Sequence, residues 1–162
     1  MNLIKIYKNT FLVILLSFVL SACAQQQKAT KMDSQIKDDV YVGTDTVEYL
    51  AKGVPDRVFF ATNKSKLTTR SRDTLRKQAT FLRKNKDVTV TVEGHADERG
   101  TREYNLALGE RRANAAKDYL MTYGVSGKRI TVISYGKEKP VNPASSPLAW
   151  SQNRRSVTIK TN

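Results

Sequence analysis

The sequence predicts an α+β fold of two layers, in which helices pack on one face of a small mixed sheet in the order βαβαββ. Short runs of β-branched and apolar residues at 57–61, 88–92, 130–133 and 156–159 predict four strands. The two intervals between the first three runs carry the apolar spacing of helices. Alternation of these two patterns favours layers packed around one core.

The interval after the first strand predicts an amphipathic helix. Four residues recur at the spacing of one helical face: Leu75, Gln78, Ala79 and Leu82. Charged residues take the opposite side: Arg72, Asp73, Arg76, Lys77, Arg83 and Lys84. One apolar and one charged face are typical of a helix that covers a sheet.

The second helix is expected at about residues 104–123, after a strand whose residues 88–92 alternate at period two. Its buried stripe contains small residues that allow close packing: Leu106, Gly109, Ala113, Ala116 and Leu120. Gly124 is well placed to end this helix in the left-handed conformation. We expect a loop with Pro140, Pro143 and Pro147 between the last two strands.

Residues 1–22 predict a secretory signal peptide that is removed from the mature chain. Lys5 and Lys8 precede an apolar run at 10–20, and the segment has no acidic residue. The run is shorter than the roughly 20 residues that a transmembrane helix needs. A permanent membrane span is therefore the weaker interpretation.

The signal peptide ends in Leu20-Ser21-Ala22-Cys23, which resembles the lipobox of bacterial lipoproteins. The resemblance implies that Cys23 receives acyl chains such as palmitate, and two or more chains hold a protein firmly on a membrane. The residue after the cysteine is Ala24 rather than aspartate. In this resemblance, that implies sorting to the outer membrane, with the domain facing the periplasm. A chance cysteine beside a cleavage site is the alternative.

The mature chain divides into a tether and one domain. Residues 23–53 are mostly polar and predict a flexible lipidated tether with one short ordered piece at 47–50. Residues 54–162 have the patterns of a globular domain. Cys23 is the single cysteine, so no intramolecular disulfide can form.

The chain is strongly basic. Its formal net charge is +13, and +11 remains once the signal peptide with Lys5 and Lys8 is removed. Such a chain could bind nucleic acid, anionic headgroups or an acidic polymer. Export disfavours nucleic acid and leaves the cell envelope, although binding of lipopolysaccharide or nucleic acid by charge alone stays an alternative.

A polar motif lies where the strand at 88–92 gives way to the second helix. Asp97 follows that strand in a turn, which is where rigid scaffolds place binding groups. Thr101, Leu108 and Arg112 share one helical face with Asn105, at spacings of four, three and four. We expect Arg112 to lie next to Asp97, and the first turn of the helix to face the same pocket. One carboxylate beside one guanidinium is complementary to a zwitterion.

Residues 92–101, 104–106 and 108–113 closely resemble the OmpA-like domain of the peptidoglycan-associated lipoprotein (Pal) family. The segments 57–60, 134–140 and 153–155 extend this resemblance to most of the domain. It implies an OmpA-like fold that binds peptidoglycan without catalysis or cofactor, through diaminopimelate in the stem peptide. It also implies membership of the Tol-Pal system, which links outer membrane and cell wall during cell division, with TolB as a protein partner.

The resemblance implies a role for each residue of the motif. Asp97 receives the ammonium group of diaminopimelate, and Arg112 holds its carboxylate in a bidentate contact. Thr101 adds a hydrogen bond, and Leu108 packs on the methylene chain. The sequence departs from the family at Thr62-Asn63-Lys64, where a Phe-Asp pair usually precedes the lysine, so we assign Asn63 no site role.

Two other interpretations of the motif stay open. Asp97 and Arg112 could form only a surface ion pair. Asp97 could instead pair with Glu93 or Glu98 as the two carboxylates of a wall hydrolase, although an arginine beside Asp97 would keep it ionised.

The remaining polar residues of the motif are interpreted as structural. His95 is the sole histidine, and without a second imidazole or thiolate it makes a poor zinc site. The arginine pairs at 111–112 and 154–155 are interpreted as solvated faces and part of the acidic-polymer surface, rather than as a phosphate site.

Overall fold

The computed structural model describes residues 35–162, and one compact unit runs from Ile36 to Asn162. The predicted signal peptide, Cys23 and the tether up to residue 34 lie outside the described residues. The strands are β1 (Ile36–Lys37), β2 (Val40–Tyr41), β3 (Tyr49–Ala51), β4 (Val54–Pro55), β5 (Arg57–Phe59), β6 (Val90–His95), β7 (Ile130–Gly136) and β8 (Arg155–Lys160). The helices are α2 (Thr69–Lys84), α3 (Arg102–Thr122), a short 3₁₀ helix (Gly127–Arg129) and α4 (Pro147–Asn153).

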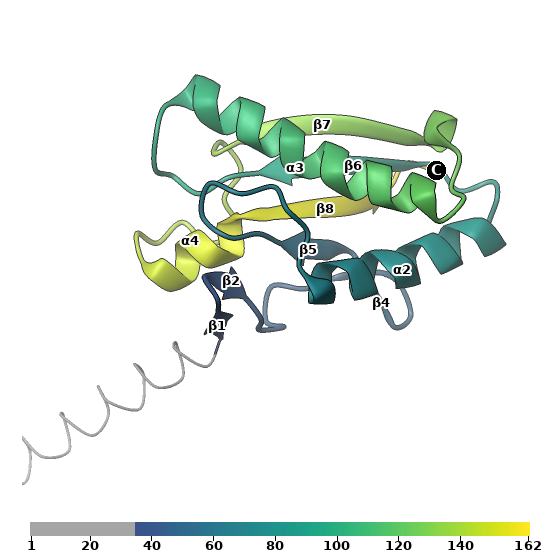
Figure 1. The fold of residues 1–162 in the computed structure, drawn as a ribbon, viewed down its shortest axis with the longest axis horizontal. Coiled ribbons are helices and arrows are strands. Elements are labelled where there is room, and N and C mark those ends of the chain that lie inside the picture. Colours follow the sequence, from purple (N-terminus) through teal and green to yellow (C-terminus); the bar gives the residue numbers. More distant parts are fainter. Residues whose placement is uncertain (1–34) are drawn as a thin grey trace, which may run out of the picture. The chain divides into compact units, whose positions relative to one another are not determined.

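Four strands form one mixed sheet in the order β5-β8-β6-β7. Strand β6 runs parallel to β7, whereas β8 is antiparallel to both β5 and β6. Helices α2 and α3 lie on the same face of this sheet (Figure 1). The predicted two-layer α+β fold is therefore confirmed, and the last strand of the chain lies inside the sheet.

The core lies between the sheet and the two helices. Val90 and Val92 point from β6 into a cluster of buried side chains that includes Leu75 and Leu82 of α2 and Leu120 of α3. Burial of each such side chain contributes roughly 1.5–3 kcal/mol to folding. Within the described residues, no helix combines the length and apolar character needed to cross a membrane.

Two glycines set the distance between α3 and β6. A Cβ atom on Gly94 would lie 1.8 Å from the carbonyl oxygen of Gly109, and one on Gly109 would lie 2.4 Å from the Ser134 hydroxyl. The helix backbone therefore packs directly on the strand backbone. This contact explains the small residues of the predicted stripe, and it fixes the start of α3 beside the end of β6.

The expected loop between the last two strands is partly helical, so that prediction was incomplete. Pro147 is the first residue of α4, and the Ser146 hydroxyl caps the helix by accepting a hydrogen bond from the Ala149 amide at 3.2 Å. Proline is favoured at this position because its missing N–H would be unpaired there in any case. All three prolines were expected in a loop, whereas Pro147 begins a helix.

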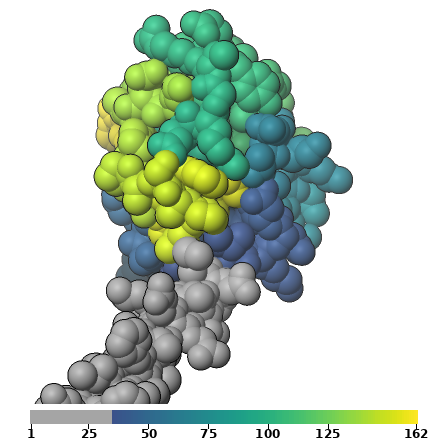
Figure 2. All heavy atoms as spheres, turned by 90° about the vertical axis from the view of Figure 1, so that its left-hand side faces the viewer, coloured from purple at the N-terminus to yellow at the C-terminus, as the bar shows by residue number. Residues whose placement is uncertain are grey.

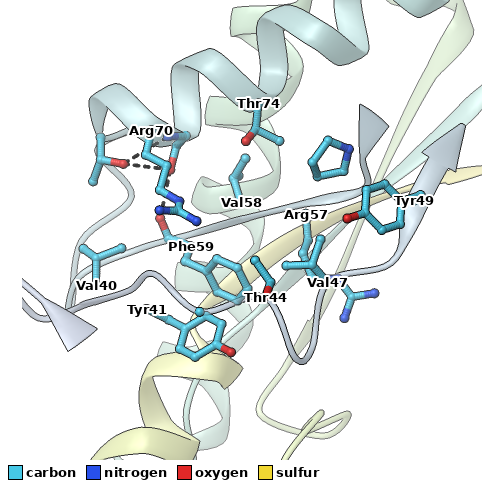
Figure 3. Close-up of a pocket in the computed structure, with 14 residues that line it drawn as sticks. Val40, Tyr41, Thr44, Val47, Tyr49, Arg57, Val58, Phe59, Arg70 and Thr74 are labelled. Atoms are coloured by element: carbon cyan, nitrogen blue, oxygen red, sulfur yellow. Dashed lines mark hydrogen bonds between the residues drawn. The ribbon is translucent and has the colours of Figure 1, made fainter. Parts of the chain in front are cut away.

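The prediction of a flexible tether up to residue 53 was wrong for most of residues 36–53, although the short ordered piece expected at 47–50 overlaps β3. Tyr41 is fully buried and packs edge-on against Phe59, with 4.7 Å between ring centroids. The two rings border a cavity of about 90 Å³ between this segment, β5 and α2 (Figure 3). Leu50 of the second hairpin joins the main core. These contacts decide the boundary, because scattered apolar residues are buried only once partners surround them.

Candidate functional site

The candidate site lies at the carboxyl end of β6. The Ala96 amide donates to the Gly136 carbonyl at 2.7 Å, so pairing with β7 continues one residue past the strand. Asp97 follows and is 7% exposed. The turn after it is fixed from two sides, because Asn105 donates to the Arg99 carbonyl and Lys137 to the Gly100 carbonyl, each at 2.8 Å. The Asp97 carboxylate is therefore held in a defined position.

Two arginines bind the Asp97 carboxylate. Arg99 donates from Nε to Oδ1 at 3.2 Å and from Nη2 to Oδ2 at 2.7 Å. Arg154 donates from Nη1 to Oδ2 at 3.2 Å. Burial opposes ionisation of Asp97, but the hydrogen bonds and the charge of Arg99, together with the hydrogen bond from Arg154, outweigh it and lower the pKa of the carboxyl group. Asp97 is thus an anion at neutral pH.

Arg112 reaches the same strand end from inside the fold. It is fully buried, and it donates to the carbonyls of Lys64 at 2.9 Å, His95 at 2.8 Å and Ala61 at 3.2 Å. Burial, followed by the charge of Arg154, lowers its pKa to about 10, so it remains a cation at pH 7.

The expected contact between Arg112 and Asp97 is only partly realised. Arg112 binds the carbonyl two residues before Asp97, but the described ion pairs join Asp97 to Arg99 and Arg154 instead. The alternative of a surface ion pair between Arg112 and Asp97 was wrong, because Arg112 has no exposed surface. In this conformation Arg112 holds the turn at 61–64 against the end of β6.

The other predicted site residues lie where the helical spacing places them. The Thr101 hydroxyl caps α3 by accepting a hydrogen bond from the Tyr104 amide at 3.2 Å, and Thr101 itself is exposed. Leu108 is 3% exposed and lies on the buried face of α3 together with Asn105 and Arg112. The shared helical face is confirmed, but most of it points into the protein.

Sequence reasoning missed Arg154 and Asp39. Arg154 was interpreted as part of a solvated pair, but it is 2% exposed and also donates to the Asp39 carboxylate at 2.9 Å. In the sheet Gly94 faces Ser156, and this register brings the residues just before β8 beside those just after β6. Asp39 arrives through the β1–β2 hairpin, and Figure 2 shows α4 beside this N-terminal segment. Neither contact could be predicted from a local sequence pattern.

The turn at 61–64 borders the site. The Thr62 amide donates to the Asp39 carboxylate at 2.7 Å, and Asn63 is exposed with a φ of 55°. Asparagine tolerates this left-handed conformation better than most residues. This observation gives Asn63 a conformational role and does not assign it a contact with a ligand.

The nearby carboxylates and the histidine are engaged elsewhere. Glu98 accepts a hydrogen bond from the Trp150 indole at 2.8 Å and another from Ser145, and these bonds lower its pKa. His95 is 1% exposed and stacks on Tyr135 on the sheet face opposite the helices. Across residues 35–162, no cluster of three or more His, Cys, Asp or Glu side chains could hold a metal.

Comparison with known proteins shows what the chain resembles. The OmpA family is matched by residues 59–154. A protein named peptidoglycan-associated lipoprotein from Rhizobium meliloti is 55% identical over 106 residues, which cover 65% of this chain and 60% of that protein. A protein of the same name from Brucella melitensis is 51% identical over 106 residues, covering 65% of this chain and 63% of the relative. The chain thus spans about three fifths of the length of these curated relatives.

Solved structures show the same fold. The crystal structure of the peptidoglycan-associated lipoprotein from Burkholderia pseudomallei has a TM-score of 0.64 and 34% identity, covering 65% of this chain and 90% of that one. The C-terminal domain of Helicobacter pylori MotB has a TM-score of 0.62 at 22% identity, covering 66% of this chain and 84% of that domain. The second likeness concerns the fold alone.

Proposed function

Because this chain belongs to the OmpA family, we propose that it is an outer-membrane lipoprotein that binds peptidoglycan non-covalently and catalyses no reaction on it. The relatives named peptidoglycan-associated lipoprotein support this function. The observation that carries the proposal is the ionised carboxylate of Asp97, fixed at a strand end where the charge of Arg99 reaches solvent.

The proposed ligand is the diaminopimelate residue of the stem peptide. Its ammonium group binds Asp97, and the exposed Thr101 hydroxyl adds a hydrogen bond. Its methylene chain packs on Leu108, which is 3% exposed and so becomes accessible only if the residues that cover it move. Charge-assisted hydrogen bonds contribute roughly 1.5–3 kcal/mol each. A few such contacts give a modest affinity per site, which suits a protein that detaches and rebinds as the wall grows.

Arg112 is proposed to hold the carboxylate of diaminopimelate. Its guanidinium is buried behind the turn at 61–64, so a bidentate contact requires this turn to move. The carboxylate would then replace the carbonyls of Ala61 and Lys64 as acceptors. Because guanidinium and carboxylate are both charged, the new hydrogen bonds are stronger than those they replace.

We propose that acyl chains on Cys23 anchor the protein in the outer membrane, and that the tether spans the gap to the wall. The family resemblance supports TolB and other Tol-Pal components as partners that compete with the wall. Replacement of the anchor residue, Cys23→Ser, should release the protein from membranes. Retention of this variant in the membrane fraction would contradict the lipid anchor.

A wall hydrolase with paired carboxylates fits the geometry less well. Two arginines keep Asp97 ionised, so it has no proton to donate as a general acid at neutral pH. The pKa of Glu98 is also lowered, by its bonds to Ser145 and Trp150. Release of soluble muropeptides by the purified protein would favour this alternative.

Co-sedimentation with purified peptidoglycan tests the proposed site. We expect Asp97→Asn to lose binding, because the amide has nearly the same shape but cannot attract an ammonium group. Arg111→Ala is the matched control: it removes a neighbouring arginine that is exposed on α3, and it should still pellet with the wall. If Asp97→Asn pellets as well as the control, the proposed site is wrong.

Arg112 calls for a milder substitution than alanine. Alanine would leave three carbonyl groups without their donor, so a loss of binding could reflect a loss of fold. Arg112→Lys keeps the charge and part of the hydrogen bonding but cannot form a bidentate contact. We expect it to weaken peptidoglycan binding while its circular-dichroism spectrum stays that of the parent protein.

A further inference from the structure

We propose that the Arg99 side chain is an internal competitor of the ligand, which occupies Asp97 in the free protein and leaves when the ammonium group of the wall peptide arrives. This inference rests on the proposed function. It adds a specificity-determining residue, Arg99, whose contacts account for the exchange.

The hydrogen-bonding capacity of Asp97 is already used. Oδ1 accepts from the backbone amide and Nε of Arg99, both at 3.2 Å. Oδ2 accepts from Nη2 of Arg99 at 2.7 Å and from Nη1 of Arg154 at 3.2 Å. A carboxylate offers about four lone-pair positions. An incoming ammonium group therefore has to replace one of these donors.

Arg154 is too firmly held to leave. Its side chain is 2% exposed, and it also donates to the Phe60 carbonyl at 3.1 Å and to the Asp39 carbonyl at 2.7 Å. Its departure would leave the buried Phe60 carbonyl without its donor, at a cost of roughly 1–3 kcal/mol, and would also break its two hydrogen bonds to Asp39. Arg154 stays in place and keeps Asp97 oriented.

Arg99 has the opposite character. Its side chain is 42% exposed, and its further contacts are a 3.3 Å hydrogen bond to the Thr62 hydroxyl and a stack on Trp150, 4.4 Å from the ring centroid. Only the cation of this pair is exposed, because the Asp97 side chain is 9% exposed, but Asp97 keeps Arg154 when Arg99 leaves and water solvates the freed guanidinium, so the net contribution of Arg99 is about 1 kcal/mol or less. The Arg99 carbonyl is held by Asn105, so the side chain can swing away while the turn keeps its shape.

The exchange gives the site its selectivity. A cation that replaces Arg99 restores the second positive charge on Asp97, whereas a neutral group would leave the carboxylate with Arg154 alone. The site therefore favours a free ammonium group over an amide of the same size. The competition also keeps the affinity lower than it would be at an unoccupied carboxylate.

Trp150 provides a direct readout of this exchange. It is the only tryptophan of the chain, and the Arg99 guanidinium stacks on its ring. Titration with a soluble diaminopimelate-containing peptide should therefore change the tryptophan fluorescence of the parent protein as Arg99 leaves. Calorimetry in parallel gives the affinity.

The test compares Arg99→Met with Arg102→Met. Both variants lose one exposed arginine, but Arg102 pairs with Glu138 and does not contact Asp97. We expect Arg99→Met to bind the peptide about two- to fivefold more tightly than Arg102→Met, which is the fold-change that up to about 1 kcal/mol of lost competition produces. Its fluorescence should change little on binding, because no guanidinium leaves the indole.

The outcomes separate this inference from the proposed function. If Asp97→Asn loses the peptide while Arg99→Met binds no more tightly than Arg102→Met, the competitor role is overturned and the site stands. If Asp97→Asn binds as tightly as the parent protein, the proposed site fails and the competitor role fails with it.

Discussion

Two carboxylate–guanidinium pairs in this protein have nearly the same geometry but different surroundings. Arg57 donates from Nε and Nη2 to the two oxygens of Asp56 at 2.8 and 2.7 Å, and Arg99 makes the same two contacts with Asp97 at 3.2 and 2.7 Å. The Arg57 side chain is 6% exposed, whereas that of Arg99 is 42% exposed. The comparison teaches that burial of the cation decides whether a pair is part of the fold or can exchange its partner.

The surroundings explain the difference. Arg57 lies within β5 opposite Val157, and it borders a hollow on the sheet face without helices together with Arg155 and His95. Arg99 lies in a turn at the end of β6 and shares its anion with Arg154. Strand β5 is held by its pairing with β8 and its Arg57 side chain is buried, whereas a turn leaves one side open to water.

The largest effect is expected when the buried pair is broken. Arg57→Met keeps an apolar stem of similar length but leaves the Asp56 carboxylate buried without a cation. We expect the free energy of unfolding to fall by about 3–5 kcal/mol, measured by urea denaturation with circular dichroism. A loss below about 1 kcal/mol would mean that the Asp56–Arg57 pair contributes no more to stability than the Asp97–Arg99 pair.

The second prediction uses the pH dependence of His95, which lies on the Arg57 side of the sheet. Burial, and then the charges of Arg155, Arg57 and Lys139, lower its pKa from 6.5 to about 3. The unfolded chain therefore binds a proton between pH 6.5 and about 3 that the folded protein does not bind. Unfolding becomes easier as pH falls through this window, by up to roughly 1.4 kcal/mol per pH unit.

The variant His95→Gln isolates this contribution. Because glutamine does not titrate, the stability of the variant should fall less steeply than that of the parent protein between pH 6.5 and 3. Thermal denaturation at a series of pH values measures both slopes. Equal slopes would mean that neither burial nor the surrounding cations lower the pKa of His95 in the folded protein.

The third prediction concerns Asp97, which follows His95 by two residues in the chain. The pKa of Asp97 is lowered below its usual 3.8, so its contribution to stability is complete above about pH 4 and is lost as pH falls through the lower, folded-state pKa. Asp97→Asn should reduce stability at pH 7 by about 1–3 kcal/mol, because Arg154 loses a charged partner. The difference between variant and parent should shrink below pH 3.8.

The smallest effect on stability is expected for Arg99→Met. The Arg99 cation is exposed and Asp97 keeps Arg154 as a partner, so the loss should be about 1 kcal/mol or less, and urea denaturation should barely separate this variant from the parent protein. The same substitution is expected to change peptide affinity, whereas Arg57→Met should change mainly stability. A strong loss of stability in Arg99→Met would remove the contrast between the two pairs.

The sequence by itself determined much of this protein. Period-two alternation around Val90 and Val92 predicted a strand, and the repeat through Leu75 and Leu82 predicted a helix, because burial on one face imposes the period of the element. The position of Asp97 after a strand, and the helical face shared by Leu108 and Arg112, also followed from local spacing. The family resemblance rested on the same short segments.

Only the tertiary structure decided which charges meet. Arg154 and Asp39 are 115 positions apart in the chain and are joined by a hairpin and by the insertion of β8 between β5 and β6. Strand order and register are set by packing over the whole sheet, so no local pattern predicted that Arg154 would reach Asp97. For the same reason the sequence showed Arg112 as a site residue but could not show that it is buried, with Arg99 holding the exposed side of the carboxylate.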